Sequence, residues 1–222
     1  MQIKTSQAVE DYLKAIFEIT RKATRASTND IAELLEVTPA SVTGMLHKLT
    51  TIRPPLIQYE KHHGAVLTQK GEQLALEVIR HHRLLETFLQ DKLGYSWDQV
   101  HDEADRLEHV ISEELEERIA QVLHNPSFDP HGDPIPSRDF RLPVQSSKTL
   151  SGALPGDQVT VVRIDTGDAE LLRFLASIQL TIHSLITVKN VSPFDGNMSL
   201  LIYGSPEPVT LGPRITSKIY VR

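Results

Sequence analysis

The chain has 222 residues, of which 40% are hydrophobic and 23% are charged, so it is long enough for two or three small domains. The absence of cysteine excludes disulfides, thiolate metal sites and thiol catalysis. The formal net charge is −6, but the acidity is concentrated in residues 74–141, which hold 15 acidic and 7 basic side chains. Residues 1–73 hold 8 acidic and 9 basic side chains, so the net charge of the whole chain does not exclude nucleic acid as a partner. The chain shows no apolar signal segment and no membrane span, and we expect a cytoplasmic protein without membrane contact.

The N-terminal part shows the pattern of three short helices. Apolar side chains recur at helical spacing across residues 5–22. Ser27 and Asp30 have the spacing of a capping box that starts a second, short helix. Thr38 followed by Pro39 predicts an N-cap and the first position of a third helix. The tight turn between the second and third helices indicates a helix-turn-helix, although an ordinary three-helix packing unit has the same pattern.

The third predicted helix has one apolar and one small, polar face. Small side chains let a helix backbone approach base edges, and the methyl groups of Thr or Ala can contact thymine methyl groups. The apolar face comprises Val42, Met45, Leu46 and Leu49. The residues that we expect to contact DNA at this helix are Thr38, Pro39, Ala40, Ser41, Thr43, Gly44, His47 and Lys48.

Residues 56–67 predict a β-hairpin with a Lys-His-His-Gly tip at residues 61–64. A hairpin that directly follows a helix-turn-helix is typical of a winged helix-turn-helix, in which the wing reaches a DNA backbone or minor groove. We therefore expect Lys61 to contact DNA phosphates. Thr68 follows as the N-cap of a long helix.

Two successive helical stretches carry histidine and carboxylate side chains at helical spacing. His82 and Glu86 are four residues apart on the apolar face of the stretch 74–93. In the next stretch, one face of a continuous helix would present His101, Asp105, Glu108 and His109. Oxygen and imidazole ligands suit Mn, Fe or Zn, so the two faces predict a metal site between the helices. Taken alone, the second stretch also fits the solvated face of an acidic helix.

Residues 125–143 are rich in proline and turn dipeptides and predict a linker. We interpret His131, which lies in it, as a loop residue rather than a ligand. After the linker, β-branched segments and one helical insert at residues 169–178 predict a small SH3-like barrel. No phosphate loop, nucleophile elbow or HExxH sequence is present, so we expect no enzyme. The predicted strands are Gln158–Ile164, Ser184–Val191, Ser199–Tyr203 and Lys218–Val221.

Several motifs in the first 140 residues point to one family. They lie at residues 9–13 (VEDYL), 30–35 (DIAELL), 38–43 (TPASVT), 67–71 (LTQKG), 81–86 (HHRLLE), 100–109 (VHDEADRLEH) and 125–136, which ends in GDPIP. With these motifs the chain resembles the diphtheria-toxin-repressor family of metal-dependent transcriptional regulators. The C-terminal segment is similar to that family by architecture more than by motif.

The resemblance implies a mainly α fold with small β elements. Its parts would be a winged helix-turn-helix DNA-binding domain (1–73), a helical dimerisation and metal-binding domain (74–141) and an SH3-like domain (142–222). It also implies a homodimer that binds double-stranded operator DNA and regulates genes of metal homeostasis. The primary metal site would use Asp11, Asp105, Glu108 and His109, and the ancillary site would use His82, Glu86 and His101 with Glu170, or less readily Asp168, from the third domain.

The resemblance favours Mn(II), with Fe(II) as the alternative. Iron-sensing members have Met and Cys where this chain has Asp11 and Asp105, whereas manganese-sensing members have carboxylates. Some manganese members place a Glu at the position of Lys14, whose ammonium cannot ligate a metal. Two other classes of metal protein stay open. A di-metal oxidase needs Glu-x-x-His on each of two helices, but Arg106 stands three residues before His109. A metal-storage or adaptor protein would not need the winged hairpin.

Overall fold

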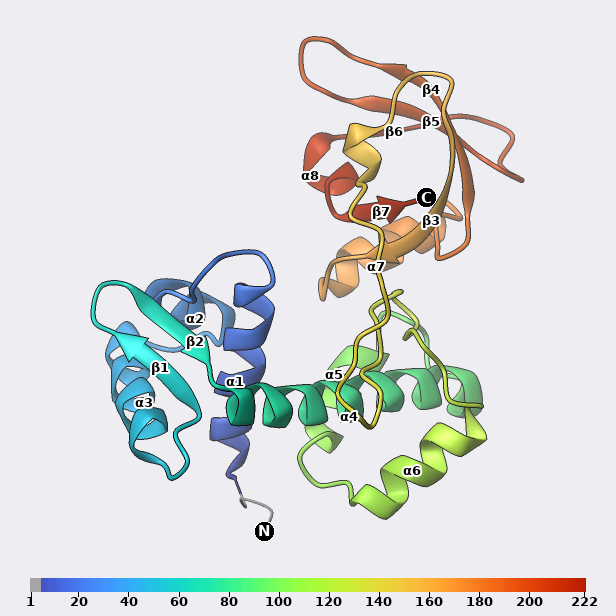
Figure 1. Cartoon of the computed structure of the whole chain (residues 1–222). Coiled ribbons are helices and arrows are strands. Elements are labelled where there is room, and N and C mark those ends of the chain that lie inside the picture. Colours follow the sequence, from blue (N-terminus) through green and yellow to red (C-terminus); the bar gives the residue numbers. More distant parts are fainter. Residues whose placement is uncertain (1–4) are drawn as a thin grey trace. The chain divides into compact units, whose positions relative to one another are not determined.

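The computed structural model describes residues 5–222, which fold into two compact units. The first unit comprises the described residues up to 81, together with 108–111 and 136–141. The second comprises 82–107, 112–135 and 142–222 (Figure 1). Within the described part, no helix is both long enough and apolar enough to cross a membrane.

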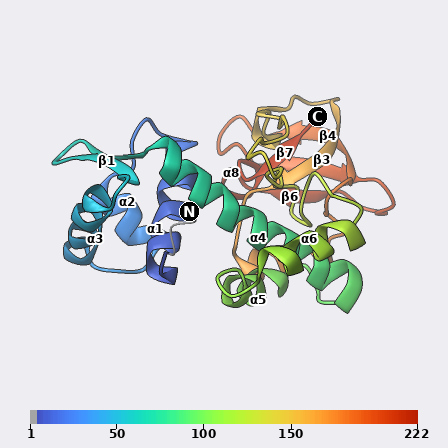
Figure 2. The ribbon, with the colours of Figure 1, turned by 60° about the horizontal axis from the view of Figure 1, so that its bottom comes forward.

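The first unit begins with a winged helix-turn-helix, as the sequence predicts. Its helices are α1 (Gln7–Thr20), α2 (Thr28–Leu34) and α3 (Pro39–Thr51), and strands β1 (Ile57–Glu60) and β2 (Gly64–Leu67) form the antiparallel wing. Figures 1 and 2 both show α3 beside this hairpin. The wing is therefore placed next to the second helix of the helix-turn-helix.

Side-chain caps explain where α2 and α3 begin. Ser27 and Asp30 form a reciprocal capping box, in which each side chain accepts from the other residue's backbone N–H. Thr38 accepts from the backbone N–H of Ser41, and Pro39 occupies the first turn. Both predicted helix starts are confirmed.

The wing is tied to the start of the helix-turn-helix by backbone pairing. Ala26 and Ala65 exchange two N–H to O=C bonds of 2.9 and 2.8 Å. Gly64, with a φ of +91°, packs so closely here that an added Cβ would lie 2.5 Å from the Ala26 carbonyl oxygen. Only glycine fits this close approach at an unstrained φ.

Three further helices follow the wing, and two of them carry the predicted ligands His82, Glu86, His101 and Asp105. They are α4 (Gln69–Leu93), α5 (Val100–Leu107) and α6 (Glu113–Val122). Because α5 ends at Leu107, Glu108 and His109 lie in the following turn. The expectation that they continue one helical face with His101 and Asp105 is therefore wrong. Helix α6, capped by Ser112, was not predicted.

The C-terminal strands form one antiparallel sheet in the order β6-β5-β4-β3-β7. All four predicted strands are present, and a short strand β6 and helix α8 were not predicted because each spans only three or four residues. The sheet buries an aliphatic core that includes Val161, Ile186 and Leu200, as expected for an SH3-like fold. The elements are β3 (Gln158–Ile164), α7 (Ala169–Ser177), β4 (Leu185–Val191), β5 (Met198–Ile202), β6 (Val209–Leu211), α8 (Pro213–Thr216) and β7 (Ile219–Val221), preceded by the 3-10 turn η1 (Leu150–Gly152).

Candidate metal centres and nucleic-acid interface

The first candidate metal centre lies in the first unit, between α1 and the turn after α5. The Nε2 atom of His109 is 2.9 Å from Asp11 Oδ1 and 3.2 Å from Glu108 Oε1. One ligand atom from each of these three residues falls within 4.8 Å of the other two. The Glu108 side chain is only 1% exposed, so its carboxylate needs a cationic partner.

Glu10 fixes the orientation of the His109 ring. Its Oε2 is 2.6 Å from Nδ1 of His109, which leaves Nε2 to face Asp11 and Glu108. Burial opposes protonation of His109, but hydrogen bonds to Asp11 and Glu10 and the charge on Glu108 prevail and raise its pKa to about 9. The metal-free site therefore holds a proton on His109 at neutral pH. A carboxylate behind a ligand histidine is a common way to fix its tautomer, but Glu10 was not predicted from the sequence.

Lys14 also reaches this centre. Its ammonium is 2.8 and 3.0 Å from the two oxygens of Glu108. Lys14 follows Asp11 by three residues, so α1 presents an acid and a base toward the same turn. The ammonium neutralises a carboxylate that a metal ion would also bind.

The second candidate centre lies wholly in the second unit. Glu86 Oε1 is 2.9 Å from His82 Nε2 and 3.1 Å from His101 Nδ1. The two imidazole nitrogens are 3.1 Å apart. Glu86 is buried, which by itself would raise its pKa, but the charge on His82 and hydrogen bonds from His101 and His82 hold it well below its usual range. The centre thus contains an ionised carboxylate among imidazoles.

The structure places Asp105 at this second centre. Its carboxylate is 3.2 Å from Nδ1 of His82 and 3.6 Å from Nε2 of His101. That Asp105 also joins Asp11, Glu108 and His109 stays a prediction.

His131 lies in a turn of the linker, as the sequence predicts, but its side chain is buried. It is 5% exposed, and its Nε2 is 3.8 Å from Glu86 Oε1. Its ring stacks on Trp97 with centroids 5.9 Å apart, and both ring nitrogens are buried without a hydrogen-bond partner. Burial lowers the pKa of His131 despite the opposing charge on Glu86, so the ring is neutral. A buried, neutral imidazole that points at Glu86 has the state of a metal ligand.

The predicted third-domain ligands lie differently. Glu170 is exposed in the first turn of α7 and is absent from the ligand groups found within residues 5–222. Asp168 is the N-cap of α7, where its Oδ1 accepts from the backbone N–H groups of Glu170 and Leu171. Its role is therefore explained by helix capping.

Both centres fit a divalent metal ion. Each brings carboxylate oxygens and imidazole nitrogens together, the donor types of Mn, Fe and Zn sites. The unpartnered nitrogens of His131 are what a missing cation would leave behind at the second centre. The helix α4 residues His82 and Glu86 are brought together as the sequence predicts, and so are Asp11, Glu108 and His109.

The residues predicted to contact DNA lie on accessible parts of α3 and the wing. Lys61 is exposed at the hairpin tip, and Thr43 is half-buried with its hydroxyl donating to the Pro39 carbonyl. Exposed on or beside α3 are Thr38, Pro39, Ala40, Ser41, Gly44, His47 and Lys48.

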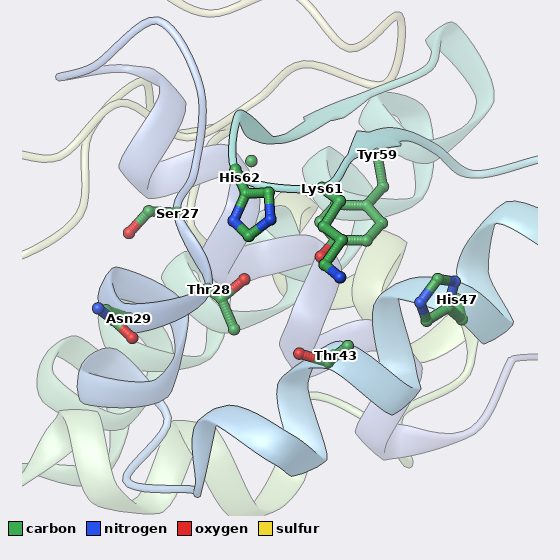
Figure 3. A pocket seen from close by; sticks show the side chains of 9 residues that line it. Ser27, Thr28, Asn29, Thr43, His47, Tyr59, Lys61 and His62 are labelled. Atoms are coloured by element: carbon green, nitrogen blue, oxygen red, sulfur yellow. The ribbon is translucent and has the colours of Figure 1, made fainter.

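A polar pocket of about 450 Å³ opens between the wing, α3 and the start of α2 (Figure 3). His47 of α3 meets Tyr59 of β1 edge-on, with ring centroids 5.6 Å apart. Figure 3 also shows Lys61 and Thr28 among the lining side chains. Hydroxyl, imidazole and ammonium donors on this surface suit a nucleic-acid backbone.

Family models match three stretches of the chain. They are the iron dependent repressor N-terminal DNA binding domain over residues 4–65, the iron dependent repressor metal binding and dimerisation domain over residues 68–137, and the FeoA domain over residues 148–222. The three matches follow one another along the chain with short gaps.

Individual relatives include iron and manganese repressors. The iron-dependent repressor IdeR of Mycobacterium tuberculosis is 38% identical over 127 residues, or 57% of this chain and 54% of that protein. The chain thus spans about half the length of the curated relatives that it matches. Among solved structures, a manganese-dependent transcriptional repressor in complex with manganese is 37% identical, with 96% of this chain and 98% of that chain covered and a TM-score of 0.86. The manganese regulator SloR is 30% identical over 99% of both chains, with a TM-score of 0.79.

Proposed function

The chain belongs to the diphtheria-toxin-repressor family of metal-dependent transcriptional regulators, and from this membership we propose that it is a homodimeric, Mn(II)-responsive repressor of metal-homeostasis genes. We assign DNA binding to residues 1–73, dimerisation and metal binding to 74–141, and the SH3-like domain to 142–222. The observation that carries the proposal is the pairing of an exposed winged helix-turn-helix with two carboxylate–imidazole centres.

The first centre is the proposed switch. Asp11 belongs to α1 of the DNA-binding domain, whereas Glu108 and His109 belong to the turn after α5. A bound divalent ion would supply the positive charge that three such ligands need. Asp11, Glu108 and the Nε2 atom of His109 would hold it, with Glu10 orienting the ring. Holding α1 against this turn selects one conformation of the domain, and a ligand that prefers one conformation shifts the population toward it.

The second centre is proposed to stabilise the regulator. His82, Glu86 and His101 would hold an ion, and His131 would complete the set with a third imidazole. Asp105 would orient His82 through Nδ1 and so leave Nε2 for the ion. Glu170 stays a candidate ligand by resemblance to the family.

Mn(II) is the proposed effector because the first centre offers two carboxylates and no sulfur. Affinities rise from Mn to Fe and onward toward Cu, so preference for Mn must come from hard ligands, coordination geometry and metal supply. The solved structures of similar sequence include manganese regulators, whereas the similar IdeR protein is iron-dependent. Fe(II) is therefore the alternative effector.

The test is a titration of the metal-free protein with Mn(II), Fe(II) and Zn(II) in the presence of a labelled operator fragment. The fragment is first selected from random DNA, and its binding is measured by fluorescence anisotropy. We expect Mn(II) to activate binding at least as fully as Fe(II). Asp11→Ala should remain folded and respond poorly to metal. The matched control is Asp102→Ala, which removes an exposed carboxylate from the first turn of α5. Undiminished metal-dependent binding by Asp11→Ala would rule out the switch.

A further inference from the structure

We propose that the SH3-like domain controls the second metal centre by positioning His131, and that Arg163 on β3 is a positioning residue. The inference rests on the proposed role of His131 as a ligand. It assigns to the third domain a function in metal binding that needs no ligand side chain from that domain.

The backbone at His131 is pressed against β3. The carbonyl oxygen of His131 accepts from the backbone N–H of Ile164 at 2.9 Å. The next residue, Gly132, has a φ of +85°, and an added Cβ would lie 2.1 Å from the Val162 carbonyl oxygen. No side chain fits between the linker and the strand at this point. The strand therefore sets where the backbone of His131 lies.

An ion pair holds the same loop from its other side. Asp129 Oδ1 accepts from the backbone N–H groups of His131 and Asp133, at 2.8 and 2.9 Å. Asp133 Oδ1 is in turn 3.3 Å from the guanidinium of Arg163. This guanidinium lies 3.7 Å from the ring centroid of Tyr220 on β7. Because Arg163 is 8% exposed and stacked, its charge is held in place rather than swinging in solvent.

The imidazole of His131 depends on this support. Its two nitrogens have no hydrogen-bond partner, so apart from the 3.8 Å approach of Nε2 to Glu86 Oε1 no polar contact fixes the ring. Only its backbone position and the stacking on Trp97 direct Nε2 toward Glu86. A shift of the loop is therefore transmitted directly to the ligand atom. Groups that orient metal ligands typically change metal affinity by about 10–100-fold when they are removed.

The experiment is a Mn(II) titration of the full-length protein, with free Mn(II) measured by electron paramagnetic resonance. The fluorescence of Trp97, the single tryptophan of the chain, reports on the second centre because it stacks on His131. We expect Arg163→Gln to weaken Mn(II) binding at this centre by about tenfold. Asp133→Asn breaks the same ion pair from the other partner, together with a 3.9 Å contact to Arg83, and should weaken binding at least as much, which keeps the test open if one variant does not fold.

A matched control separates this effect from a general loss of charge pairing. Lys148→Gln removes a cation that lies 3.8 Å from Asp157 elsewhere in the same domain, and it should leave Mn(II) affinity unchanged. The melting temperature of each metal-free variant shows whether the domain still folds. An equal loss of affinity in Lys148→Gln would overturn the proposal.

A double-mutant cycle tests whether Arg163 acts through His131. In a His131→Ala background, Arg163→Gln should cause little further loss, because the atom that it positions is gone. The same tenfold loss in both backgrounds would overturn the proposal. If His131→Ala weakens Mn(II) binding but Arg163→Gln and Asp133→Asn do not, only the positioning role fails. If His131→Ala itself has no effect, the ligand assignment fails, and the positioning role falls with it.

Discussion

The charge state of His109 leads to a quantitative prediction about the metal-free protein. Its pKa is about 9 in the folded state, against 6.5 for an ordinary histidine. A group whose pKa is raised on folding stabilises the protein fully below its unfolded pKa, and this contribution is lost as pH rises through its folded pKa. The stabilisation from His109 should therefore be complete near pH 6.5 and absent above about pH 9.

The size of this effect follows from the contacts. Each pKa unit corresponds to about 1.4 kcal/mol, so the rise from 6.5 to about 9 gives an upper bound of about 3.5 kcal/mol. Asp11 is 35% exposed and partly screened by solvent, which reduces the expected loss to about 1–2 kcal/mol. Most of the stabilisation of protonated His109 that does not come from Asp11 comes from Glu10, whose side chain is 18% exposed, and from buried Glu108.

The measurement is urea unfolding in the presence of a chelator at several pH values from 6 to 9.5, followed by far-ultraviolet circular dichroism. His109→Gln is the control, because glutamine keeps a polar side chain that does not titrate. Between pH 6.5 and 9, we expect the free energy of unfolding of the parent to fall by about 1–2 kcal/mol more than that of His109→Gln. Identical pH profiles for the parent and His109→Gln would refute the assignment of the proton to this site.

Three further outcomes are expected. Thr43→Ala should change the base preference of DNA binding. Lys61→Ala should instead weaken binding to all sequences and lower the slope of log affinity against log salt concentration by about one. If both variants bind like the parent across a series of salt concentrations, neither residue belongs to the interface. Lys14→Gln should strengthen Mn(II) binding at the first centre in calorimetry, since the ammonium that competes for Glu108 is lost, and weaker binding would contradict that competition. Ser27→Ala should lower the free energy of unfolding by about 1 kcal/mol through loss of the capping box, as measured by urea titration, and no change would mean that the cap is dispensable.

The sequence predicts those features that depend on neighbours in the chain. The caps at Ser27 and Thr38, the strand Gln158–Ile164 and the pair His82–Glu86 are local, and each is found as expected. Their spacing alone determines which groups can meet, so no knowledge of tertiary structure is needed.

The features that the sequence does not show depend on contacts distant in sequence or on where one helix stops. His131 reads as a linker residue because the proline-rich sequence around it shows no periodicity, and only its packing against Trp97 and Glu86 reveals a buried imidazole. Glu108 and His109 are expected on the helix of His101 and Asp105 because nothing in the acidic run marks the end of α5 at Leu107. Helix ends are the least certain part of any pattern-based reading.

The pairing of Ala26 with Ala65 has a consequence for how the protein would search DNA. Because Gly64 also packs onto the Ala26 carbonyl, the wing is fastened to the segment before α2 by backbone contacts. A surface that is already ordered loses little conformational entropy on binding. The rate of association with DNA should then be limited by diffusion and charge steering rather than by folding of the wing. We therefore expect this rate to depend strongly on salt concentration, with no slow step from ordering of the wing.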